Sequence, residues 1–461
     1  MAQVVIEGKS YEAREGERLA EALRRFGFAV PLPCGGRGSC GKCRVTVDGR
    51  AELACQYEIH SDITVALPER ETIVSETGAR VSGRLTERSA LALDIGTTTL
   101  ALALVSLDDK KVVRVVTRPN PQRAYGADVM SRVGHCMAHG PVGLQLAVIG
   151  AVNEMCRELG APNVDTLYAA GNTAMLHLFF GVDCSSLGAA PYTPVFLAEK
   201  TASGESLGLP GVKNVVSLPG AAAFVGADLT AGLNYVGFPP PGKYRLLIDL
   251  GTNAEVVLFS RQTALCTAAA AGPCFEGANI SCGMSASPGA VCAFDAAGYR
   301  TIGDEPAKGL CGTGLVDVIA ALLADETVDE TGFMECEEYE IAPSVTLTQG
   351  DVRQYQLAKS AVCSAVQTLV RRLGIGFDDI DALYLSGGFS AKINVAHAAA
   401  TGLLPPELRD RCVAVNNSSL LGTVRYACEK NDLSAYLHHL RYVDLAADPV
   451  FSERFIENMT F

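Results

Sequence analysis

The sequence contains no tryptophan, no excess of basic residues and no long apolar run. Because no apolar run reaches the ~18 residues needed to cross a bilayer, we expect no membrane-spanning helix. The N-terminal twenty residues lack an apolar core after a basic start, so we expect a cytoplasmic rather than a secreted protein. The formal net charge of −13 argues against nucleic acid as the main ligand.

Two common nucleotide-binding motifs are also missing. No segment fits the P-loop pattern G-x-x-x-x-G-K-[ST], and no G-x-G-x-x-G opens a strand–helix–strand unit. The P-loop and Rossmann folds are therefore excluded as the source of a nucleotide site. The chain is instead rich in glycine (46 of 461 residues) and cysteine (16). In a cytosolic chain, this many cysteines indicates buried thiols, metal ligands or redox chemistry.

Charge and residue pattern divide the chain into two units. The N-terminal 68 residues carry nine Lys and Arg and nine Asp and Glu, so the whole negative charge lies on the remainder. A polar, poorly periodic stretch with two glycines near its middle separates the units and is typical of a linker. The expected organisation is a small domain over 1–68, a linker over 69–89 and a larger unit over 90–461, with lobes of roughly 90–235 and 236–461.

Four cysteines follow a spacing typical of an iron–sulfur cluster. The spacing is C-x5-C-x2-C-x11-C, with glycines between the first three cysteines. Iron clusters take thiolates from a tight loop and one more from a separate strand, and glycine lets the loop wrap closely. Zinc or plain structural cysteines are the alternative, but a crowded glycine loop and a fourth ligand on a hairpin fit zinc badly. The candidate metal ligands are Cys34, Cys40, Cys43 and Cys55.

The rest of the small domain has a strand-rich pattern. Two short strands at 2–7 and 10–13 precede an amphipathic helix within 17–28. Asp48-Gly49 is a strong hairpin signal, and a last strand is expected at 63–67. This order resembles the β-grasp domain of plant- and vertebrate-type [2Fe-2S] ferredoxins. The resemblance implies a [2Fe-2S] cofactor held by the four cysteines.

The larger unit contains a degenerate repeat. Segments 91–105 and 246–259 each place Asp-x-Gly-Thr between two apolar strands, with the aspartates 155 residues apart. The repeat predicts two related α/β lobes with a ligand between them. The N–H groups and hydroxyls of such turns can hold phosphate oxygens, and the carboxylates can hold Mg²⁺, usually through water. The candidates are Asp94 and Asp249 as catalytic residues, and Gly96, Thr97, Thr98, Thr99, Gly251, Thr252 and Asn253 as nucleotide-binding residues.

Two other glycine motifs suit a nucleotide. An apolar strand ends in Ser-Gly-Gly, where missing side chains leave room for an adenosine; an ordinary glycine turn is the alternative. A Gly-Thr-Gly motif opens a helix, which is a favourable arrangement for an anion. Small-residue helices at 221–233 and 417–428 suit close crossing at a hinge. The candidate binding residues in the two motifs are Gly312, Thr313, Gly314, Gly387 and Gly388.

Other residues are expected to be mainly structural. Glu255 is a weak catalytic candidate because alternation along its strand leaves its direction ambiguous. Four further cysteines lack a compact ligand loop, so buried thiols are favoured over a second cluster. These are Cys266, Cys274, Cys282 and Cys292, and the histidines expected to be ordinary helix residues are His177, His438 and His439. Helices are expected at 143–158, 164–180, 221–234, 314–324, 350–374, 391–400 and 418–429.

The order of motifs in the larger unit resembles the acetate- and sugar-kinase, heat-shock-chaperone and actin superfamily. The matching order is phosphate turn, connecting helix, second phosphate turn, adenosine glycines and second connecting helix. This resemblance implies two ribonuclease-H-like lobes that close on ATP and Mg²⁺. The expected fold class is therefore α/β and α+β multidomain, a β-grasp ferredoxin followed by a two-lobed actin-like ATPase.

The combination of these two domains resembles the reductive activators of corrinoid proteins, and the segments 170–177 and 271–280 match phrases of that family. The resemblance implies an ATP-hydrolysing reductase that returns cobalt(II) to cobalt(I) for methyl transfer. Its partners would be a corrinoid protein of a methyltransferase system and a low-potential electron donor, with a homodimer as the assembly. Longer members carry an additional domain between ferredoxin and ATPase, where this chain has about 20 residues.

Other functions remain open from the residues alone. One is ATP-gated electron donation to another low-potential metalloenzyme, as in the activators of radical dehydratases. Another is a redox-sensing module in which the nucleotide cleft acts as a switch. A small-molecule kinase would need a substrate pocket and a catalytic base that the sequence does not identify.

Overall fold

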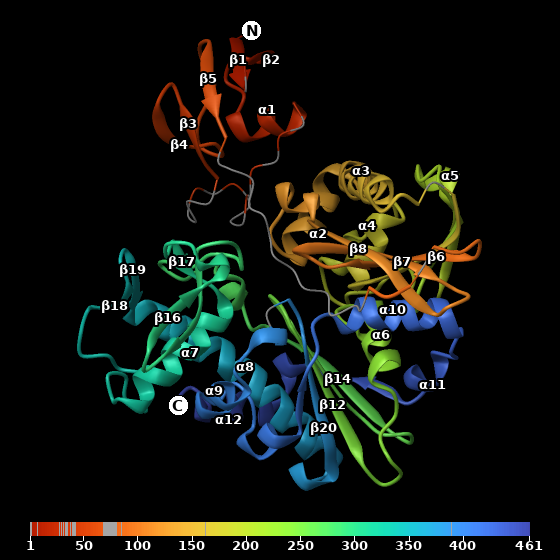
Figure 1. The fold of residues 1–461 in the computed structure, drawn as a ribbon, viewed down its shortest axis with the longest axis vertical. Helices are drawn as coiled ribbons and strands as arrows, with labels where there is room; N and C mark the ends of the chain where they lie inside the picture. Colours follow the sequence, from red (N-terminus) through yellow and green to blue (C-terminus); the bar gives the residue numbers. More distant parts are fainter. Residues whose placement is uncertain are drawn as a thin grey trace.

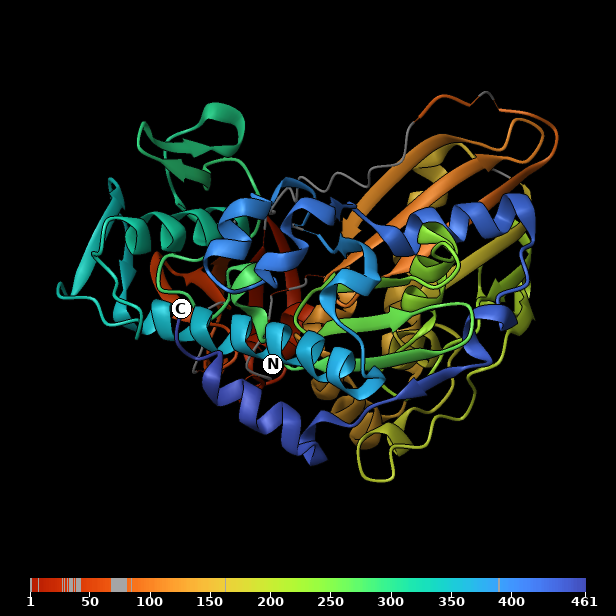
Figure 2. The same ribbon diagram turned by 90° about the horizontal axis from the view of Figure 1, so that it is seen from below.

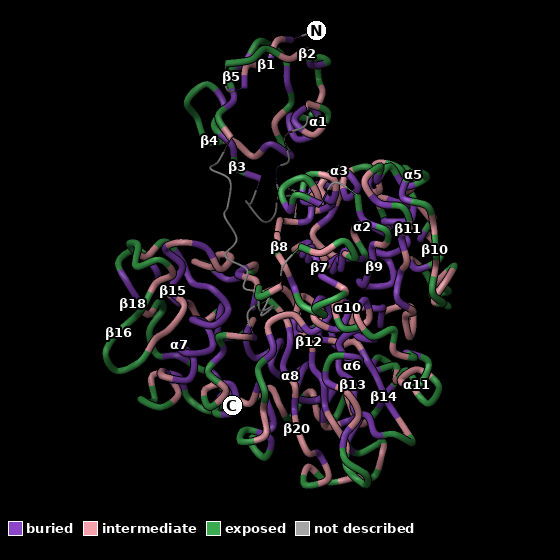
Figure 3. The backbone as a smooth tube through the Cα atoms, turned by 45° about the vertical axis from the view of Figure 1, so that its right-hand side comes forward, coloured by how far each residue is buried: buried purple, intermediate pink, exposed green. Residues whose placement is uncertain are grey.

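The computed structural model contains a small N-terminal domain and a larger part with two lobes (Figure 1). Central strands of the lobes are buried and the exposed residues lie at the periphery (Figure 3). No helix in the part of the chain that is described is long and apolar enough to cross a membrane. The described residues are 2–6, 8–26, 28, 30, 32, 36, 38, 43–67, 81–83, 85–161, 163–388 and 390–461.

The N-terminal domain is a five-stranded mixed sheet crossed by one helix. The strand order is β2-β1-β5-β3-β4, with β1 antiparallel to β2 and parallel to β5. Alternate side chains of β1, including Val4 and Ile6, are buried against Leu19 and Leu23 of the helix. The elements are β1 (Ala2–Ile6), β2 (Lys9–Ala13), α1 (Leu19–Arg25), β3 (Arg44–Val47), β4 (Arg50–Leu53) and β5 (Ile63–Ala66).

The first lobe is built on a six-stranded sheet in the order β10-β11-β9-β6-β7-β8. The strands are β6 (Ser89–Ile95), β7 (Thr99–Ser106), β8 (Lys111–Pro119), β9 (Val164–Gly171), β10 (Lys200–Ser203) and β11 (Val212–Ser217). The helices are η1 (Pro121–Ala124), α2 (Val129–His139), α3 (Val142–Leu159), α4 (Thr173–Phe179), η2 (Ser185–Leu187) and α5 (Gly204–Leu207).

The second lobe has a six-stranded sheet in the order β21-β20-β12-β13-β14-β22. These strands are β12 (Tyr244–Leu250), β13 (Ala254–Phe259), β14 (Ala264–Ala269), β20 (Ile380–Ser386), β21 (Cys412–Ala414) and β22 (Leu440–Tyr442). The 25-residue helix α8 (Gln349–Leu373) packs against β13 and β14, with α12 (Pro449–Glu457) beside it (Figure 2). Other helices are η3 (Pro273–Glu276), η4 (Ile302–Asp304), α7 (Gly312–Ala324), η5 (Phe377–Asp379), η6 (Ser390–Lys392), α9 (Val395–Ala400), η7 (Pro406–Arg411), α11 (Ser434–Leu437) and η8 (Leu445–Ala447). Further strands are β15 (Ala290–Asp295), β16 (Gly298–Thr301), β17 (Gly309–Leu310), β18 (Glu338–Ala342) and β19 (Val345–Thr348).

The two lobes repeat one topology. The strand order β11-β9-β6-β7-β8 of the first sheet corresponds to β21-β20-β12-β13-β14 of the second. In each sheet an antiparallel hairpin carries the Asp-x-Gly-Thr turn, and a parallel strand follows it on the other side. The internal repeat seen in the sequence therefore corresponds to two structurally related halves.

Two helices are exchanged between the lobes: α6 (Ala227–Val236) and α10 (Ser418–Glu429), which lie side by side between them (Figure 1). Helix α6 follows the first lobe in sequence but buries Leu229 and Leu233 against strands of the second sheet. Helix α10 comes late in the chain but buries Leu420 against the alanine-rich face of the first sheet. Each lobe is thus completed by a helix from the other part of the sequence.

Three expected helices differ from the structure. The segment 391–400 is η6 followed by helix α9, which begins only at Val395, because Asn394 caps a new helix by accepting from the Ala396 and His397 amides. The segment 164–180 is strand β9 followed by helix α4, because its first half is a buried apolar strand and Asn172 caps a new helix by accepting from the Ala174 amide. The helix expected from 221 begins at Ala227, after a bridge between Ala222 and Val225.

Part of the expected linker, residues 69–80 and 84, lies outside the described residues. Its described end lies against the first lobe. Val81 forms a bridge with Val112, and the amides of Ser82 and Gly83 donate to the Val112 carbonyl over 3.0 Å.

Candidate functional site

The two Asp-x-Gly-Thr turns lie at corresponding ends of the two sheets. Asp94 is on β6 and Asp249 on β12, each one residue before its strand ends. Both carboxylates are linked to the start of helix α10: Asp94 accepts from Asn417 and Ser419, and Asp249 accepts over 3.4 Å from Ser386, whose hydroxyl accepts from the Ser418 amide. Burial, and then the charge of Asp94, raises the pKa of Asp249. The fold therefore brings together the two residues that the sequence predicts to be catalytic.

Asp94 is held by the start of helix α10. Its two carboxylate oxygens accept from Asn417 Nδ2 and Ser419 Oγ, each over 2.7 Å. Asp94 is only 8% exposed, and burial raises its pKa while these hydrogen bonds oppose the rise. Because both oxygens are engaged by α10, Asp94 also joins the first phosphate turn to the exchanged helix.

Asp249 belongs to a group of half-buried carboxylates. Glu255 pairs directly with Asp249 across β12 and β13, and side chains of such a pair point to the same face. Asp228, in the first turn of α6, is close enough for its charge to raise the pKa of Glu255. Burial, followed by the charges of neighbouring carboxylates, raises the pKa of Asp228 and of Asp249 to about 7.

This carboxylate group fits a magnesium ion held largely through water. Oxygen ligands suit Mg²⁺, which commonly keeps several waters and takes one or two carboxylates together with substrate phosphates. Among the described residues, no three His, Cys, Asp or Glu side chains are placed to hold a metal ion directly. Asp249 and its neighbours Asp228 and Glu255 are therefore suited to bind hydrated Mg²⁺ rather than to enclose a bare ion.

Glu276, at the end of η3, joins the two Asp-x-Gly-Thr turns. Its Oε2 accepts from Thr98 Oγ1 of the first turn and its Oε1 from Thr252 Oγ1 of the second, both over 3.0 Å. Burial raises the pKa of Glu276, and the two hydroxyl donors oppose the rise. Thr98 and Thr252, both predicted to bind phosphate, therefore lie close together, because they share one carboxylate.

A buried arginine, Arg132, binds a backbone carbonyl of the first turn. Arg132 of α2 is fully buried, and its guanidinium donates to the carbonyls of Thr97 (2.6 Å) and Gly126 (3.0 Å). Burial lowers its pKa to about 10, so the group stays charged at neutral pH. Its positive charge acts on Glu276, so the first turn lies between an anion and a cation.

The other turn residues have structural roles as well. A Cβ on Gly96 would lie 2.6 Å from the Thr99 carbonyl oxygen, so the sharp first turn requires glycine. Asn120 donates to the Gly96 carbonyl over 2.8 Å. In the second turn, the Gly251 amide donates to the Asn253 carbonyl over 3.0 Å. Phosphate binding by these residues stays a prediction.

The glycine motifs of the second lobe are explained in part by packing. A Cβ on Gly387 would lie 2.1 Å from the Leu250 carbonyl oxygen, whereas Gly388 faces open space. At the start of α7, a Cβ on Gly312 or Gly314 would lie 2.2 Å from a backbone oxygen, and Thr313 donates to the Cys292 carbonyl. These contacts account for glycine at 312, 314 and 387, and nucleotide binding there stays a prediction.

The structure describes two of the four predicted cluster ligands. Cys34 and Cys40 lie outside the described residues, while Cys43 and Cys55 are buried in the N-terminal core. The Ala54 amide, next to Cys55, donates to the Cys43 carbonyl over 3.0 Å. The fold therefore places one cysteine from the loop beside the cysteine from the hairpin, as a [2Fe-2S] site requires.

Gln56 contacts two glycines of the predicted cluster loop and the sulfur of Cys55. Its Nε2 donates to the Gly36 carbonyl over 2.7 Å and lies 3.4 Å from the Cys55 sulfur. Gly38 has a φ of +78°, and a Cβ there would lie 2.9 Å from Gln56 Cγ. A donor aimed at a ligating sulfur suits a thiolate that binds iron. This fit supports a [2Fe-2S] cluster as the group held by the loop.

The residues expected to be structural agree with that expectation in part. His177 lies in helix α4, but His438 and His439 lie in the turn after α11, and Cys282 and Cys292 are half-buried rather than buried. His177 is buried, with Nδ1 2.7 Å from the Thr173 carbonyl and Nε2 accepting from the Val195 amide. His438 and His439 line a surface hollow with Gln262, Thr263 and Arg441. Burial raises the pKa of Cys266 and of Cys274 to about 12, which is typical of inert thiols.

Several residues of the site carry no recognisable motif. Asp228, Arg132 and Gln56 were not singled out by the sequence, and Glu276 lies in a segment matched to a family phrase without an assigned role. Gln56 directly follows a predicted ligand, which is a usable signal. The contacts of Asp228, Arg132 and Glu276 depend on the fold, because their partners lie on other elements.

Family models match almost the whole chain in three consecutive parts. A 2Fe-2S iron-sulfur cluster binding domain matches residues 4–64, and the RACo middle region matches 89–239. The model described as the C-terminal domain of RACo, the ASKHA domain, matches 243–461. The family's middle region is thus present as the first lobe, which corrects the expectation that this chain lacks a domain between the ferredoxin and the C-terminal domain.

Two curated relatives and a solved structure are similar to most or all of this chain. The corrinoid activation enzyme RamQ of Eubacterium limosum is 29% identical over 420 residues, covering 80% of this chain and 70% of RamQ. The [Co(II) methylated amine-specific corrinoid protein] reductase of Methanosarcina barkeri is 26% identical over 392 residues, covering 74% and 70% of the two chains. A solved reductive activator for corrinoid, iron-sulfur protein superposes with a TM-score of 0.72 at 25% identity, covering 100% of this chain and 98% of the other.

The family models and the solved structure extend over both the ferredoxin and the two lobes. The fold class predicted from the sequence, a [2Fe-2S] ferredoxin followed by an actin-like and sugar-kinase-like unit, is confirmed. The chain belongs to the RACo family, in which an N-terminal 2Fe-2S ferredoxin domain is joined to a C-terminal ASKHA domain.

Proposed function

We propose that this protein is an ATP-hydrolysing reductase that activates a corrinoid protein by reducing cobalt(II) to cobalt(I) for methyl transfer. The observation that carries the proposal is that one chain joins a ferredoxin cysteine site to two lobes whose Asp-x-Gly-Thr turns lie close enough to share one carboxylate, that of Glu276. The relatives described as corrinoid activation enzyme and corrinoid protein reductase match 80% and 74% of this chain, which supports the same activity here.

The cleft residues have complementary tasks in this proposal. Thr98 and Thr252 supply hydroxyl donors for phosphate oxygens from opposite lobes. Asp249, with Asp228 and Glu255 beside it, would hold hydrated Mg²⁺, which would help to neutralise phosphate charge, and Asp249 would orient the attacking water. Asp94 fixes the first turn to α10 and adds its charge to the same region.

The need for ATP follows from redox potentials. A [2Fe-2S] cluster of the plant type supplies, when bound, a one-electron donor near about −400 mV. Cobalt(I) is a stronger reductant, so its formation from such a donor is uphill and needs a source of free energy. A nucleotide that binds one arrangement of the lobes better than another can supply that difference.

The proposal includes finer points. Mg²⁺ is the metal that accompanies ATP, and a low-potential donor refills the ferredoxin domain. The protein acts in the cytoplasm as a homodimer, with a ferredoxin domain over 1–68, a linker over 69–89 and lobes of roughly 90–235 and 236–461. Helix α10, in the second of these ranges, packs on the first lobe, so the lobes are structural rather than strictly sequential units.

The decisive experiment follows cobalt directly. The protein is reduced anaerobically and mixed with a corrinoid protein in the cobalt(II) state, and the cobalt(I) absorbance is recorded with and without Mg-ATP. We expect cobalt(I) only with ATP. Cobalt(I) formation that is independent of ATP with every corrinoid partner tried would contradict the proposal. ATP-dependent electron delivery to another metalloenzyme alone would favour the alternative acceptor.

Two variants separate the two halves of the activity. Cys43→Ala should lose the cluster absorbance and cobalt reduction but keep nucleotide binding, and Cys336→Ala, at an exposed cysteine, is the matched control. Asp249→Ala should impair ATP hydrolysis while leaving the cluster absorbance unchanged. Its control is Asp165→Ala, because Asp165 is exposed and pairs only with Lys213 at 3.5 Å among the described ion pairs. Reductase activity retained in Cys43→Ala would show that the ferredoxin domain is not the donor.

A further inference from the structure

Glu276 is in an unusual position for an acidic residue, between two turns suited to bind phosphate. Its carboxylate accepts one hydroxyl from each lobe, from Thr98 and from Thr252, both over 3.0 Å. Thr98 is 178 residues away in sequence and Thr252 only 24. The carboxylate therefore links the first lobe to the second across the cleft.

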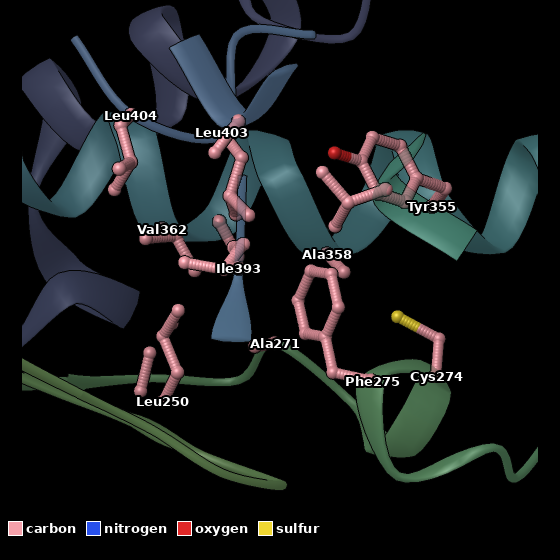
Figure 4. Close-up of a cluster of buried hydrophobic side chains, with 14 of the residues drawn as sticks. Leu250, Ala271, Cys274, Phe275, Tyr355, Ala358, Val362, Ile393, Leu403 and Leu404 are labelled. Carbon is pink, nitrogen blue, oxygen red and sulfur yellow. The ribbon is translucent and has the colours of Figure 1, made fainter. Parts of the chain in front are cut away.

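The backbone that carries Glu276 is firmly anchored in the second lobe. Phe275 and Cys274 are each 2% exposed, and the Phe275 ring meets Tyr355 of α8 edge-on at 5.9 Å (Figure 4). On the opposite side, a Cβ on Gly312 of α7 would lie 2.2 Å from the Phe275 carbonyl oxygen. Because α7 and α8 both pack against η3, Glu276 can leave the threonines only by rotating its side chain or by movement of the lobes.

The contacts of Glu276 conflict with phosphate binding at the same place. Phosphate oxygens would need the hydroxyl donors that the carboxylate now occupies, and they carry the same sign of charge. Arg132, which binds the backbone of the first turn, provides a positive charge that favours an ionised Glu276 in its contact with the two threonines. The cation can act on phosphate charge once the carboxylate has left.

We propose that Glu276 is an interlobe latch that holds Thr98 and Thr252 together in the nucleotide-free protein and is displaced by the phosphates of ATP. The inference rests on the nucleotide site of the proposed function and adds a regulatory element to it. The latched state competes with nucleotide, so the apparent affinity is reduced by the fraction of molecules in which the latch is closed. Nucleotide binding and release of the interlobe contact are then coupled events.

The first test is nucleotide affinity. The dissociation constant of a non-hydrolysable ATP analogue with Mg²⁺ is measured by calorimetry for the full chain and for Glu276→Gln and Glu276→Ala. Removing the competing charge should tighten binding by about tenfold. Glu305→Gln is the matched control, because Glu305 is an exposed glutamate of the same lobe paired with Lys308. Unchanged or weaker binding in both Glu276 variants would overturn the latch.

The second test needs no nucleotide. Amide hydrogen exchange is measured over the turns at 96–99 and 251–253 in the empty protein. Glu276→Ala should speed exchange in both turns, and saturating analogue should bring the variant and the unaltered chain to similar protection. Equal exchange in the empty proteins would overturn the latch even if the variant bound nucleotide differently.

The two tests also separate this inference from the proposed function. An unaltered chain that binds no nucleotide would contradict both the ATPase proposal and the displacement of Glu276. An unaltered chain that binds nucleotide, with variants no tighter than it, would overturn the latch alone. Far-ultraviolet circular dichroism and the cluster absorbance of each variant establish that its two parts are folded.

Discussion

Ser419 donates its hydroxyl to the carboxylate of Asp94 over 2.7 Å, although 325 residues separate the two in sequence. The bond joins the start of helix α10 to the end of strand β6, and Asn417 makes a second bond to the same carboxylate. The geometry of the first phosphate turn therefore depends on a helix made near the end of the chain.

We expect Ser419→Ala to lower the free energy of unfolding by about 1.5–3 kcal/mol, because a buried carboxylate loses a charge-assisted hydrogen bond. It should also weaken nucleotide binding, since Asp94 then holds the turn less firmly. Ser418→Ala is the matched control, because the Ser418 hydroxyl is buried with no hydrogen-bond partner among the described residues. Urea unfolding and calorimetry measure the two effects, and equal losses in both variants would argue against the bond to Asp94.

The crossing of α6 and α10 gives a second prediction. A Cβ on Gly422 would lie 1.7 Å from the Ala231 carbonyl oxygen, so Gly422→Ala must push the two helices apart. We expect a loss of about 1–3 kcal/mol in stability and slower ATP hydrolysis. Gly150→Ala, on an exposed part of α3 with nothing within 4 Å of the added carbon, should be neutral or stabilising by up to ~1 kcal/mol. Urea denaturation measures both changes, and a neutral Gly422→Ala would contradict the close crossing.

Gln56 should raise the reduction potential of the cluster. Its Nε2 lies 3.4 Å from the Cys55 sulfur, and such donors stabilise the more negative, reduced state. Gln56→Leu should lower the reduction potential by roughly 20–65 mV, the one-electron equivalent of a bond worth about 0.5–1.5 kcal/mol. Anaerobic titration followed by paramagnetic resonance measures the shift. Gln3→Leu, on strand β1 of the same domain, should leave the potential unchanged.

Replacement of Arg132 by lysine should destabilise the protein. The guanidinium donates to the carbonyls of both Thr97 and Gly126, and a single ammonium cannot reproduce that fork. We expect Arg132→Lys to cost about 1–3 kcal/mol in unfolding free energy, since a buried carbonyl loses its donor, and to weaken nucleotide binding. The control is Arg118→Lys, whose ion pair with Glu158 lies near the surface and should cost less than ~1 kcal/mol. Similar losses in the two variants, measured by urea unfolding, would contradict the role of the buried fork.

The sequence predicted most clearly what is local. The Asp48-Gly49 hairpin, the two Asp-x-Gly-Thr hairpins and the helices expected at 350–374 and 418–429 all occur, with bounds within about one residue for both helices. In these segments, turn chemistry and hydrophobic period agree with the tertiary fold. The segment 164–180 was predicted wrongly, because a buried parallel strand and a buried helix look alike in a short apolar run.

The long-range contacts of the site were harder to predict from the sequence. Asp94 and Asp249 could be proposed because each lies in a repeated motif. The direction of Glu255 became clear only from its pairing with Asp249 across the strands, and Glu276 only from its bonds to two distant turns. Such contacts leave no local pattern in the sequence. The motifs therefore predicted Asp94 and Asp249, whereas Glu276 was recognised as a site residue only from the structure.

The exchange of α6 and α10 has a consequence for synthesis on the ribosome. Chains emerge N-terminus first, at about 5–20 residues per second. The alanine-rich face of the first sheet stays uncovered until Ser418–Glu429 has been made, so this lobe must wait for nearly the whole chain. A truncated product ending before Ser418 would display that face to solvent, and we expect such fragments to bind chaperones or aggregate.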